Sequence, residues 1–162
     1  MRSTSFHRLL MCALALLANQ ATAAVPPAPK LPADAYFLMD ATTRQVLVDH
    51  NGDLSLPPAS LTKIMTSYAL AEEVDAGRAS LDEMIKVSRN AWSQNPTFKG
   101  SSLMWIEPGK PVSLADLERG VVISSGNDAS VAVAEHLAGT ESSFVDVMNQ
   151  LAAELGLDNT VY

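Results

Sequence analysis

Four stretches with helical periodicity dominate this sequence, and each is closed by glycine or by a short polar break. Their approximate ranges are 60–74, 113–123, 128–138 and 142–155. Gly139 and Gly156 directly follow the last two stretches, at the position where helices commonly end. Ser113, with Asp116 three residues later, is typical of a helix start. These signals predict four helices with short connections.

Two short apolar runs precede the helices, at residues 35–40 and 45–49, with a polar turn between them. This pattern predicts a β-hairpin. Residues 80–111 are broken by proline and glycine, which predicts short irregular pieces. A hairpin followed by helices is typical of an α+β or α/β fold with an antiparallel sheet, and not of alternating strands and helices.

The first 23 residues have the pattern of a secretory signal peptide. Arg2 and Arg8 precede the apolar run 9–18, and the small-residue sequence Ala-Thr-Ala follows at 21–23. The run is too short to span a bilayer, and methionine before Cys12 is too large for a lipidation signal. We therefore expect export and cleavage after residue 23, with the proline-rich residues 24–32 as an extended start of the mature chain.

Removal of residues 1–23 changes the net charge from −7 to −9 and takes away the only cysteine. The acidic excess argues against a nucleic-acid partner. Without cysteine, the mature chain has no thiol nucleophile, disulfide or cysteine-bound metal. His50 and His136 are its only histidines. We interpret His50 as a turn residue and His136 as a helix-surface residue, and their spacing does not suggest a metal site.

Ser60 and Lys63 are three residues apart at the start of the first predicted helix, so their side chains share one face. The first turn of a helix has free backbone N–H groups that favour a nearby negative charge, such as an oxyanion. A serine hydroxyl becomes a strong nucleophile when a base removes its proton, and a neutral lysine amine can act as that base. Lysine becomes neutral near physiological pH where burial or nearby cations lower its pKa.

The position of Lys63 on this helix leaves two interpretations open. At about 100° per residue, Lys63 lies within about 20° of Leu70 and Val74, on an apolar face. Thr66 and Glu73 lie on another arc, where a surface lysine would be expected. Lys63 is therefore either a buried amine with a lowered pKa, or a lysine whose stem covers the core while its amine reaches water.

A Ser-Gly-Asn sequence at 125–127 interrupts two predicted helices. A tight break of this kind can project both polar side chains, Ser125 and Asn127, from a rigid support. The alternative is an ordinary turn between helices, with Asn127 or Asp128 as the helix N-cap. On these residues alone, the ordinary turn is the simpler interpretation.

Three longer strings occur in order along the chain. They are Pro-Ala-Ser-Leu-Thr-Lys-Ile-Met-Thr at 58–66, Phe-Lys-Gly-Ser-Ser-Leu-Met at 98–104 and Ser-Ser-Gly-Asn-Asp-Ala at 124–129. Together they closely resemble the serine D-alanyl-D-alanine carboxypeptidases, the low-molecular-mass penicillin-binding proteins, and the resemblance covers residues 36–162. It implies a β-lactamase/transpeptidase-like fold, in which helices flank an antiparallel sheet beside an all-helical subdomain.

The resemblance also implies a role for each matching residue. Ser60 is expected to be the nucleophile that attacks the peptide bond between two terminal D-alanines, and Lys63 its general base. Ser125 is expected to pass a proton to the leaving amine, and Asn127 to orient Lys63 and the substrate amide. No cofactor and no metal are implied. The implied partners are a peptidoglycan stem peptide and β-lactam inhibitors, and the implied location is the periplasm.

The family carries a third motif, Lys-Thr-Gly, which this sequence does not contain. The motif lies on a later strand that supplies a cation and a hydroxyl for the substrate carboxylate and one oxyanion donor. Loss of one such donor costs about 2.7–4 kcal/mol of transition-state stabilisation. We therefore expect residues 24–162 to be an N-terminal portion of the catalytic domain, truncated before that strand, with doubtful activity as an isolated chain. The remaining sheet, a C-terminal β domain and an amphipathic membrane anchor are expected in later sequence.

Several functions remain open at this point. The chain is either part of a carboxypeptidase or a non-catalytic fragment that contacts peptidoglycan or other proteins. Within the enzyme class, an endopeptidase that cuts cross-links and a serine β-lactamase are the alternatives. A β-lactamase would need an additional carboxylate to activate the deacylating water.

Overall fold

The computed structural model describes residues 27–162. The chain divides into two compact units, one ending at Leu56 and the other covering Pro57–Tyr162, and each is described by itself. The predicted signal peptide at 1–23, including Cys12, lies outside the described residues.

The first unit contains the predicted β-hairpin. Strand β1 (Tyr36–Met39) pairs antiparallel with β2 (Val46–His50). The Asp40 carboxylate holds the connecting turn, because it accepts two backbone N–H bonds from that turn. The prediction for His50 was wrong. The strand pairing extends one residue beyond the apolar run, so His50 ends β2 opposite Tyr36, and the two rings stack with centroids 4.8 Å apart.

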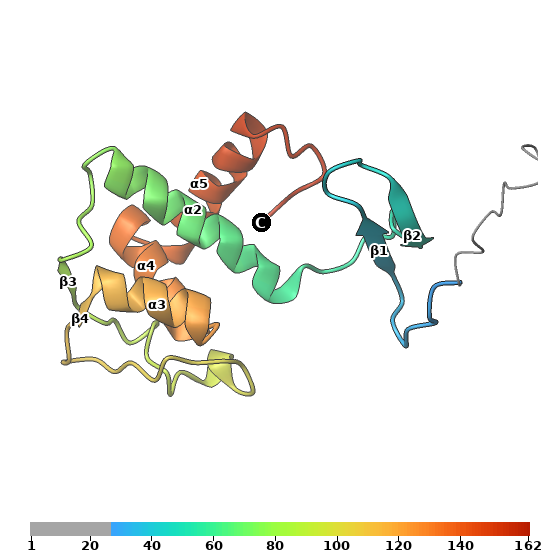
Figure 1. Ribbon diagram of the computed structural model, residues 1–162. Coiled ribbons are helices and arrows are strands. Elements are labelled where there is room, and N and C mark those ends of the chain that lie inside the picture. The colour runs from blue at the N-terminus through green and yellow to red at the C-terminus, as the bar shows by residue number, and fades with distance from the viewer. Residues whose placement is uncertain (1–26) are drawn as a thin grey trace, which may run out of the picture. The chain divides into compact units, whose positions relative to one another are not determined.

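The second unit contains the four predicted helices (Figure 1). Their bounds are α2 Thr62–Asp75, α3 Leu114–Ile123, α4 Asn127–Ala138 and α5 Glu141–Glu154. Each end lies within two residues of its prediction. Ser60 belongs to a 3-10 turn, Ala59–Leu61, that precedes α2, so it does not stand inside the α-helix as expected. Within residues 27–162, no helix combines the length and apolar composition needed to cross a bilayer.

A short antiparallel strand pair in the segment between α2 and α3 was not predicted. β3 (Met84–Ile85) pairs with β4 (Val112–Ser113). Each strand has only two residues, too few to produce an alternating pattern in the sequence. The pair ties the beginning of α3 to the chain after α2, and Leu114 N–H donates to the Glu83 carbonyl at 2.9 Å.

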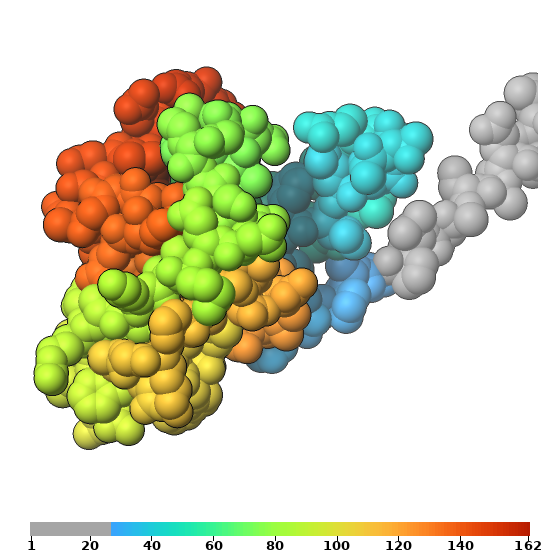
Figure 2. Space-filling model, turned by 90° about the vertical axis from the view of Figure 1, so that its left-hand side faces the viewer, coloured from blue at the N-terminus to red at the C-terminus, as the bar shows by residue number. Residues whose placement is uncertain are grey.

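The helices enclose two groups of buried apolar side chains. The first group includes Leu70, Ile85, Leu114, Leu117, Val121 and Val133. The second group consists of Met65, Ala69, Ala134, Phe144, Met148 and Ala152. Both α2 and α4 contribute to both groups, so these two helices form the centre of the unit. Figure 2 shows α5 and the last turns of α2 side by side on one face.

The solvent-facing side at the start of α2 is apolar, which contradicts the helical-wheel expectation. Thr66, expected on an exposed polar arc, is buried, whereas Leu61 and Ile64 are 67% and 68% exposed. The helix is apolar around most of its circumference, so periodicity cannot identify the covered face. Leu70 is buried and Val74 is half-buried, as expected.

His136 lies exposed on the surface of α4, as predicted, and its imidazole contacts a carboxylate there. Its Nε2 lies 3.0 Å from Glu83 Oε2, in the segment that leads into β3. Sequence periodicity could not predict this pairing, because the two residues are more than fifty positions apart in the chain.

We predict that Ser113→Ala destabilises the unit Pro57–Tyr162. The Ser113 hydroxyl accepts the Asp116 backbone N–H at 3.1 Å and thereby caps α3. Loss of such a cap costs about 0.5–2 kcal/mol, a decrease in the free energy of unfolding that urea denaturation can measure. Ser142→Ala is the control, because Ser142 is exposed on α5 and its replacement should change stability by no more than about 0.5 kcal/mol. Equal unfolding midpoints for wild type and Ser113→Ala would contradict the capping role.

Candidate active site

Four polar side chains predicted from the sequence meet beside the beginning of α2. Lys63 Nζ lies 2.6 Å from Asn127 Oδ1 and 3.5 Å from Ser60 Oγ. The Ser125 hydroxyl donates to Ser60 Oγ at 2.9 Å. Lys63 and Asn127 are 64 positions apart in the sequence. The fold therefore brings the Ser-x-x-Lys and Ser-Gly-Asn segments into direct contact.

Ser60 stands on an exposed turn whose backbone is unusual. The preceding residue, Ala59, has φ 49°, in the left-handed region that few residues other than glycine adopt. Leu61 N–H donates to the Pro58 carbonyl at 3.1 Å and closes the turn. As a result, the Ser60 hydroxyl is accessible while its backbone is held by the start of α2.

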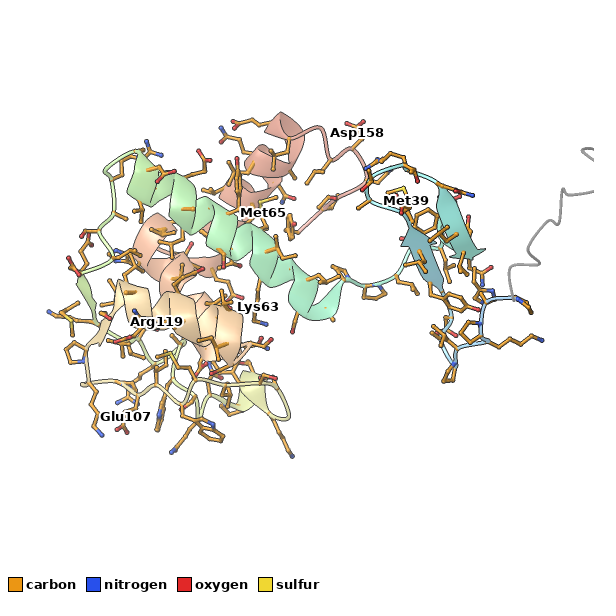
Figure 3. All side chains as sticks on the ribbon, viewed as in Figure 1. Met39, Lys63, Met65, Glu107, Arg119 and Asp158 are labelled. Atoms are coloured by element: carbon orange, nitrogen blue, oxygen red, sulfur yellow. The ribbon has the colours of Figure 1, made fainter. Side chains whose placement is uncertain are left out.

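Lys63 is half-buried in the first turn of α2. Figure 3 shows its side chain extending from α2 toward the end of α3, the region where α4 begins. Burial lowers the pKa of its ammonium group. The amine is directed to Asn127 and Ser60, which agrees with the first of the two sequence interpretations.

Ser125 has a left-handed backbone at the break between α3 and α4, with φ 51°. The residue just beyond a helix end often has this conformation, but it is usually glycine or asparagine there. A serine at this position costs backbone energy, and such outliers gather at functional sites. Here the bend places the Ser125 hydroxyl against Ser60.

Asn127 does not cap α4, so the simpler turn interpretation was wrong. Gly126 holds the N-cap position without any side-chain cap, and Asn127 is the first residue of the helix. The Asn127 side chain accepts from Lys63, and its backbone N–H donates to the Ser102 carbonyl at 2.9 Å. These long-range contacts override the local capping tendency of asparagine.

Asp128 is a residue of this region that sequence reasoning missed. Its carboxylate is fully buried next to Asn127 and accepts backbone N–H bonds from residues 104–106. The only sequence signal was an acidic residue after Ser-Gly-Asn. An acidic residue in the first turn of a helix is common for electrostatic reasons, so this signal was not specific.

A cavity of about 670 Å³ adjoins three of these four side chains and lies entirely within the second unit. Ser60, Lys63 and Asn127 line it together with Phe144 and Met148 of α5. Apolar walls with a few converging polar groups are typical of a binding site for a small molecule or a peptide end.

The arrangement supplies the groups needed for covalent acyl transfer. An accessible hydroxyl, an amine with a lowered pKa and a second hydroxyl in contact with the first can serve as nucleophile, base and proton relay. The 3.5 Å separation between Lys63 Nζ and Ser60 Oγ is long, but such bonds often shorten only when substrate is bound. Within residues 27–162, no three histidine or carboxylate side chains are placed to hold a metal ion.

Comparison with known proteins identifies the family. The profile of the D-alanyl-D-alanine carboxypeptidases matches residues 19–162. The chain belongs to this family. D-alanyl-D-alanine carboxypeptidase DacC of Escherichia coli is 47% identical over 136 residues, which make up 83% of this chain and 34% of DacC. This member of the family therefore spans about a third of the length of that relative.

Solved structures of similar proteins agree with the fold expected for a D-alanyl-D-alanine carboxypeptidase. Penicillin binding protein 6B from Escherichia coli is 43% identical with a TM-score of 0.73, over 85% of this chain and 43% of that chain. Penicillin-Binding Protein D2 from Listeria monocytogenes, in an ampicillin-bound form, is 29% identical with a TM-score of 0.63, over 80% and 49%. These matches confirm the predicted β-lactamase/transpeptidase-like fold, of which this chain forms an incomplete part.

We predict that Lys63 loses its proton at a lower pH than Lys110. Burial disfavours the charged form of Lys63 and lowers its pKa below 10.5, whereas the hydrogen bond that Lys110 donates to Glu107 raises the pKa of Lys110. NMR titration of ¹³C-labelled lysines measures both midpoints in one sample, and Lys63→Arg identifies the Lys63 signal. A Lys63 midpoint at or above that of Lys110 would show that its amine is not desolvated.

Proposed function

We propose that this chain is the N-terminal part of the catalytic domain of a serine D-alanyl-D-alanine carboxypeptidase. The proposed reaction removes the terminal D-alanine from peptidoglycan stem peptides and forms an acyl-enzyme on Ser60. The chain covers 34% of DacC, so the activity of the whole protein is part of the proposal. The observation that carries it is the contact of Ser60 Oγ with both Lys63 Nζ and Ser125 Oγ.

The proposed acylation step uses the four polar side chains in turn. Neutral Lys63 takes the proton from Ser60, whose oxygen attacks the carbonyl carbon of the penultimate D-alanine. When the peptide bond breaks, the proton held by Lys63 passes through Ser125 to the leaving amine of the last D-alanine, which restores the neutral lysine. Asn127 accepts from the Lys63 amine and holds it in place beside the nucleophile. Water then hydrolyses the ester, which releases the shortened peptide and restores the Ser60 hydroxyl.

The lowered pKa of Lys63 supports its role as the base. A lysine ammonium has no lone pair, so only the neutral amine can accept the Ser60 proton. Burial favours that neutral form and increases its population at a given pH. The rate of acylation should therefore rise as the pH increases through the pKa of Lys63.

The proposal extends to the inhibitors and location of the protein. β-Lactams are expected to acylate Ser60, which is supported by the ampicillin-bound relative from Listeria monocytogenes. We further propose that residues 1–23 are a cleaved signal peptide and that residues 24–162 act in the periplasm during cell-wall synthesis and remodelling. The sequence contains no Lys-Thr-Gly, so the substrate carboxylate site of the family has no counterpart among these residues.

We expect a fluorescent penicillin to label the protein as its source cell produces it, and Ser60→Ala to abolish this labelling. Ser125→Ala should slow labelling by about 10²-fold, which is the size of effect expected when a proton relay is lost. Ser142→Ala is the control and should label at the wild-type rate, since Ser142 is exposed on α5. Gel fluorescence over a time course measures the labelling rates of the wild type and the three variants.

Each possible failure of this labelling experiment has a distinct meaning. Persistent labelling of folded Ser60→Ala would exclude Ser60 as the nucleophile. An unlabelled wild type with a helical circular dichroism spectrum would favour the non-catalytic alternative.

We expect D-alanine release from a pentapeptide ending in D-Ala-D-Ala to be faster than cleavage of a cross-linked peptide dimer. Penicillin should turn over slowly, because no described contact of the site supplies a carboxylate that activates the deacylating water. Mass spectrometry of the three products compares the rates directly. Faster cleavage of the dimer would favour the endopeptidase alternative, and rapid penicillin hydrolysis would favour the β-lactamase alternative.

A further inference from the structure

Asp128 is a buried charged residue to which the proposed reaction assigns no role. Its side chain is 0% exposed, and no other charged residue among 27–162 is fully buried. A carboxylate loses favourable hydration when it is buried, so the protein must replace the lost water contacts. The groups that replace them indicate what the residue does.

Four backbone N–H groups surround the Asp128 carboxylate. Oδ1 accepts from Met104 at 2.8 Å and from Ala129 at 2.9 Å. Oδ2 accepts from Trp105 at 2.9 Å and from Ile106 at 3.2 Å. Three of these donors are consecutive residues of one segment, and only Ala129 belongs to α4. The carboxylate therefore fastens residues 104–106 to the first turn of α4.

The fastened segment has a backbone conformation that needs such support. Trp105 has φ 68°, in the left-handed region that is a true outlier for a bulky residue. Its side chain is 74% exposed, so packing of the indole does not explain the conformation. A bend of this kind can direct successive N–H groups to one anion, and the Asp128 carboxylate is that anion.

The same stretch of chain also holds the site residue Asn127. The Asn127 backbone N–H donates to the Ser102 carbonyl at 2.9 Å, and its side chain accepts from Lys63. Gly126 lies directly against the carboxylate: a Cβ there would stand 3.0 Å from Asp128 Oδ1 and 3.1 Å from Met104 N. A side chain larger than glycine at position 126 would therefore crowd both the carboxylate and the segment.

We propose that Asp128 is a positioning residue for the Lys63–Asn127 contact. By fastening residues 104–106 to the start of α4, it fixes the direction in which the Asn127 side chain leaves that helix. Asn127 Oδ1 then stays on Lys63 Nζ, and the amine stays beside Ser60. This inference rests on the proposed function, because it assigns Lys63 to the activation of Ser60.

Asp128→Asn tests the inference without a change in side-chain size. One acceptor oxygen becomes an NH₂ group, which faces backbone N–H donors and cannot accept from them. The rate constant of acylation by fluorescent penicillin at saturation should fall at least about tenfold, because the catalytic groups are misaligned. The penicillin concentration that gives half-saturation should change little. Asp116→Asn, an exposed carboxylate on α3, is the matched control and should change neither quantity.

A second readout does not depend on activity. In the wild-type protein, the Asn127 side-chain amide should show a nuclear Overhauser contact with the Lys63 ε-methylene group. Asp128→Asn should lose this contact while the contact between Phe144 and Met148, both in the second core group, is retained. A substitution that only lowered global stability would leave both contacts in the folded molecules.

The two readouts separate failure of this inference from failure of the proposed function. Retention of the Asn127–Lys63 contact in Asp128→Asn, or an unchanged acylation rate, would overturn the positioning role. An unlabelled wild type would end the proposed function, and loss of the contact would then still support the role of Asp128 in placing Asn127. If Asp128→Asn does not fold, Gly126→Ala is the second variant, because its added methyl group crowds the carboxylate. Gly126→Ala should also lose the Asn127–Lys63 contact, and retention of that contact would overturn the inference.

Discussion

The hydrogen bond from Lys63 to Asn127 is the constraint on which the active site depends. It joins the first turn of α2 to the first turn of α4, the two helices that contribute to both groups of buried apolar side chains. Small residues, Ala69 and Ala134, are buried together in the second of these groups. Helix packing therefore fixes the separation of the two helices, and the polar bond fixes the position of their ends.

Local sequence signals were sufficient to predict the secondary structure around this bond. The Ser113 capping pattern and the glycines after α4 and α5 act within one helical turn, so their effects can be read from neighbouring residues. The Ser60–Lys63 pair could be found for the same reason. The family strings then indicated that Ser125 and Asn127 belong to the same site, which periodicity alone did not suggest.

The remaining features depend on contacts between distant parts of the chain. Thr66 is buried on the side of α2 where residues of α4 and α5 line the cavity. Because α2 is apolar around most of its circumference, its sequence does not predict which side the other helices cover. The Asn127 side chain accepts a hydrogen bond from Lys63 instead of capping α4. The Asp128 carboxylate accepts from a segment more than twenty positions earlier in the chain. None of these three features could be predicted from the local conformational preference of the residue concerned.

The left-handed backbone of Ser125 has a consequence for how this sequence can change. Glycine adopts that conformation without steric cost, so selection for stability alone would replace the serine. Glycine cannot supply the hydroxyl that contacts Ser60. Stability of the fold therefore favours glycine at position 125, whereas the contact with Ser60 requires serine. The chain carries serine, the residue that gives the less stable backbone at this position.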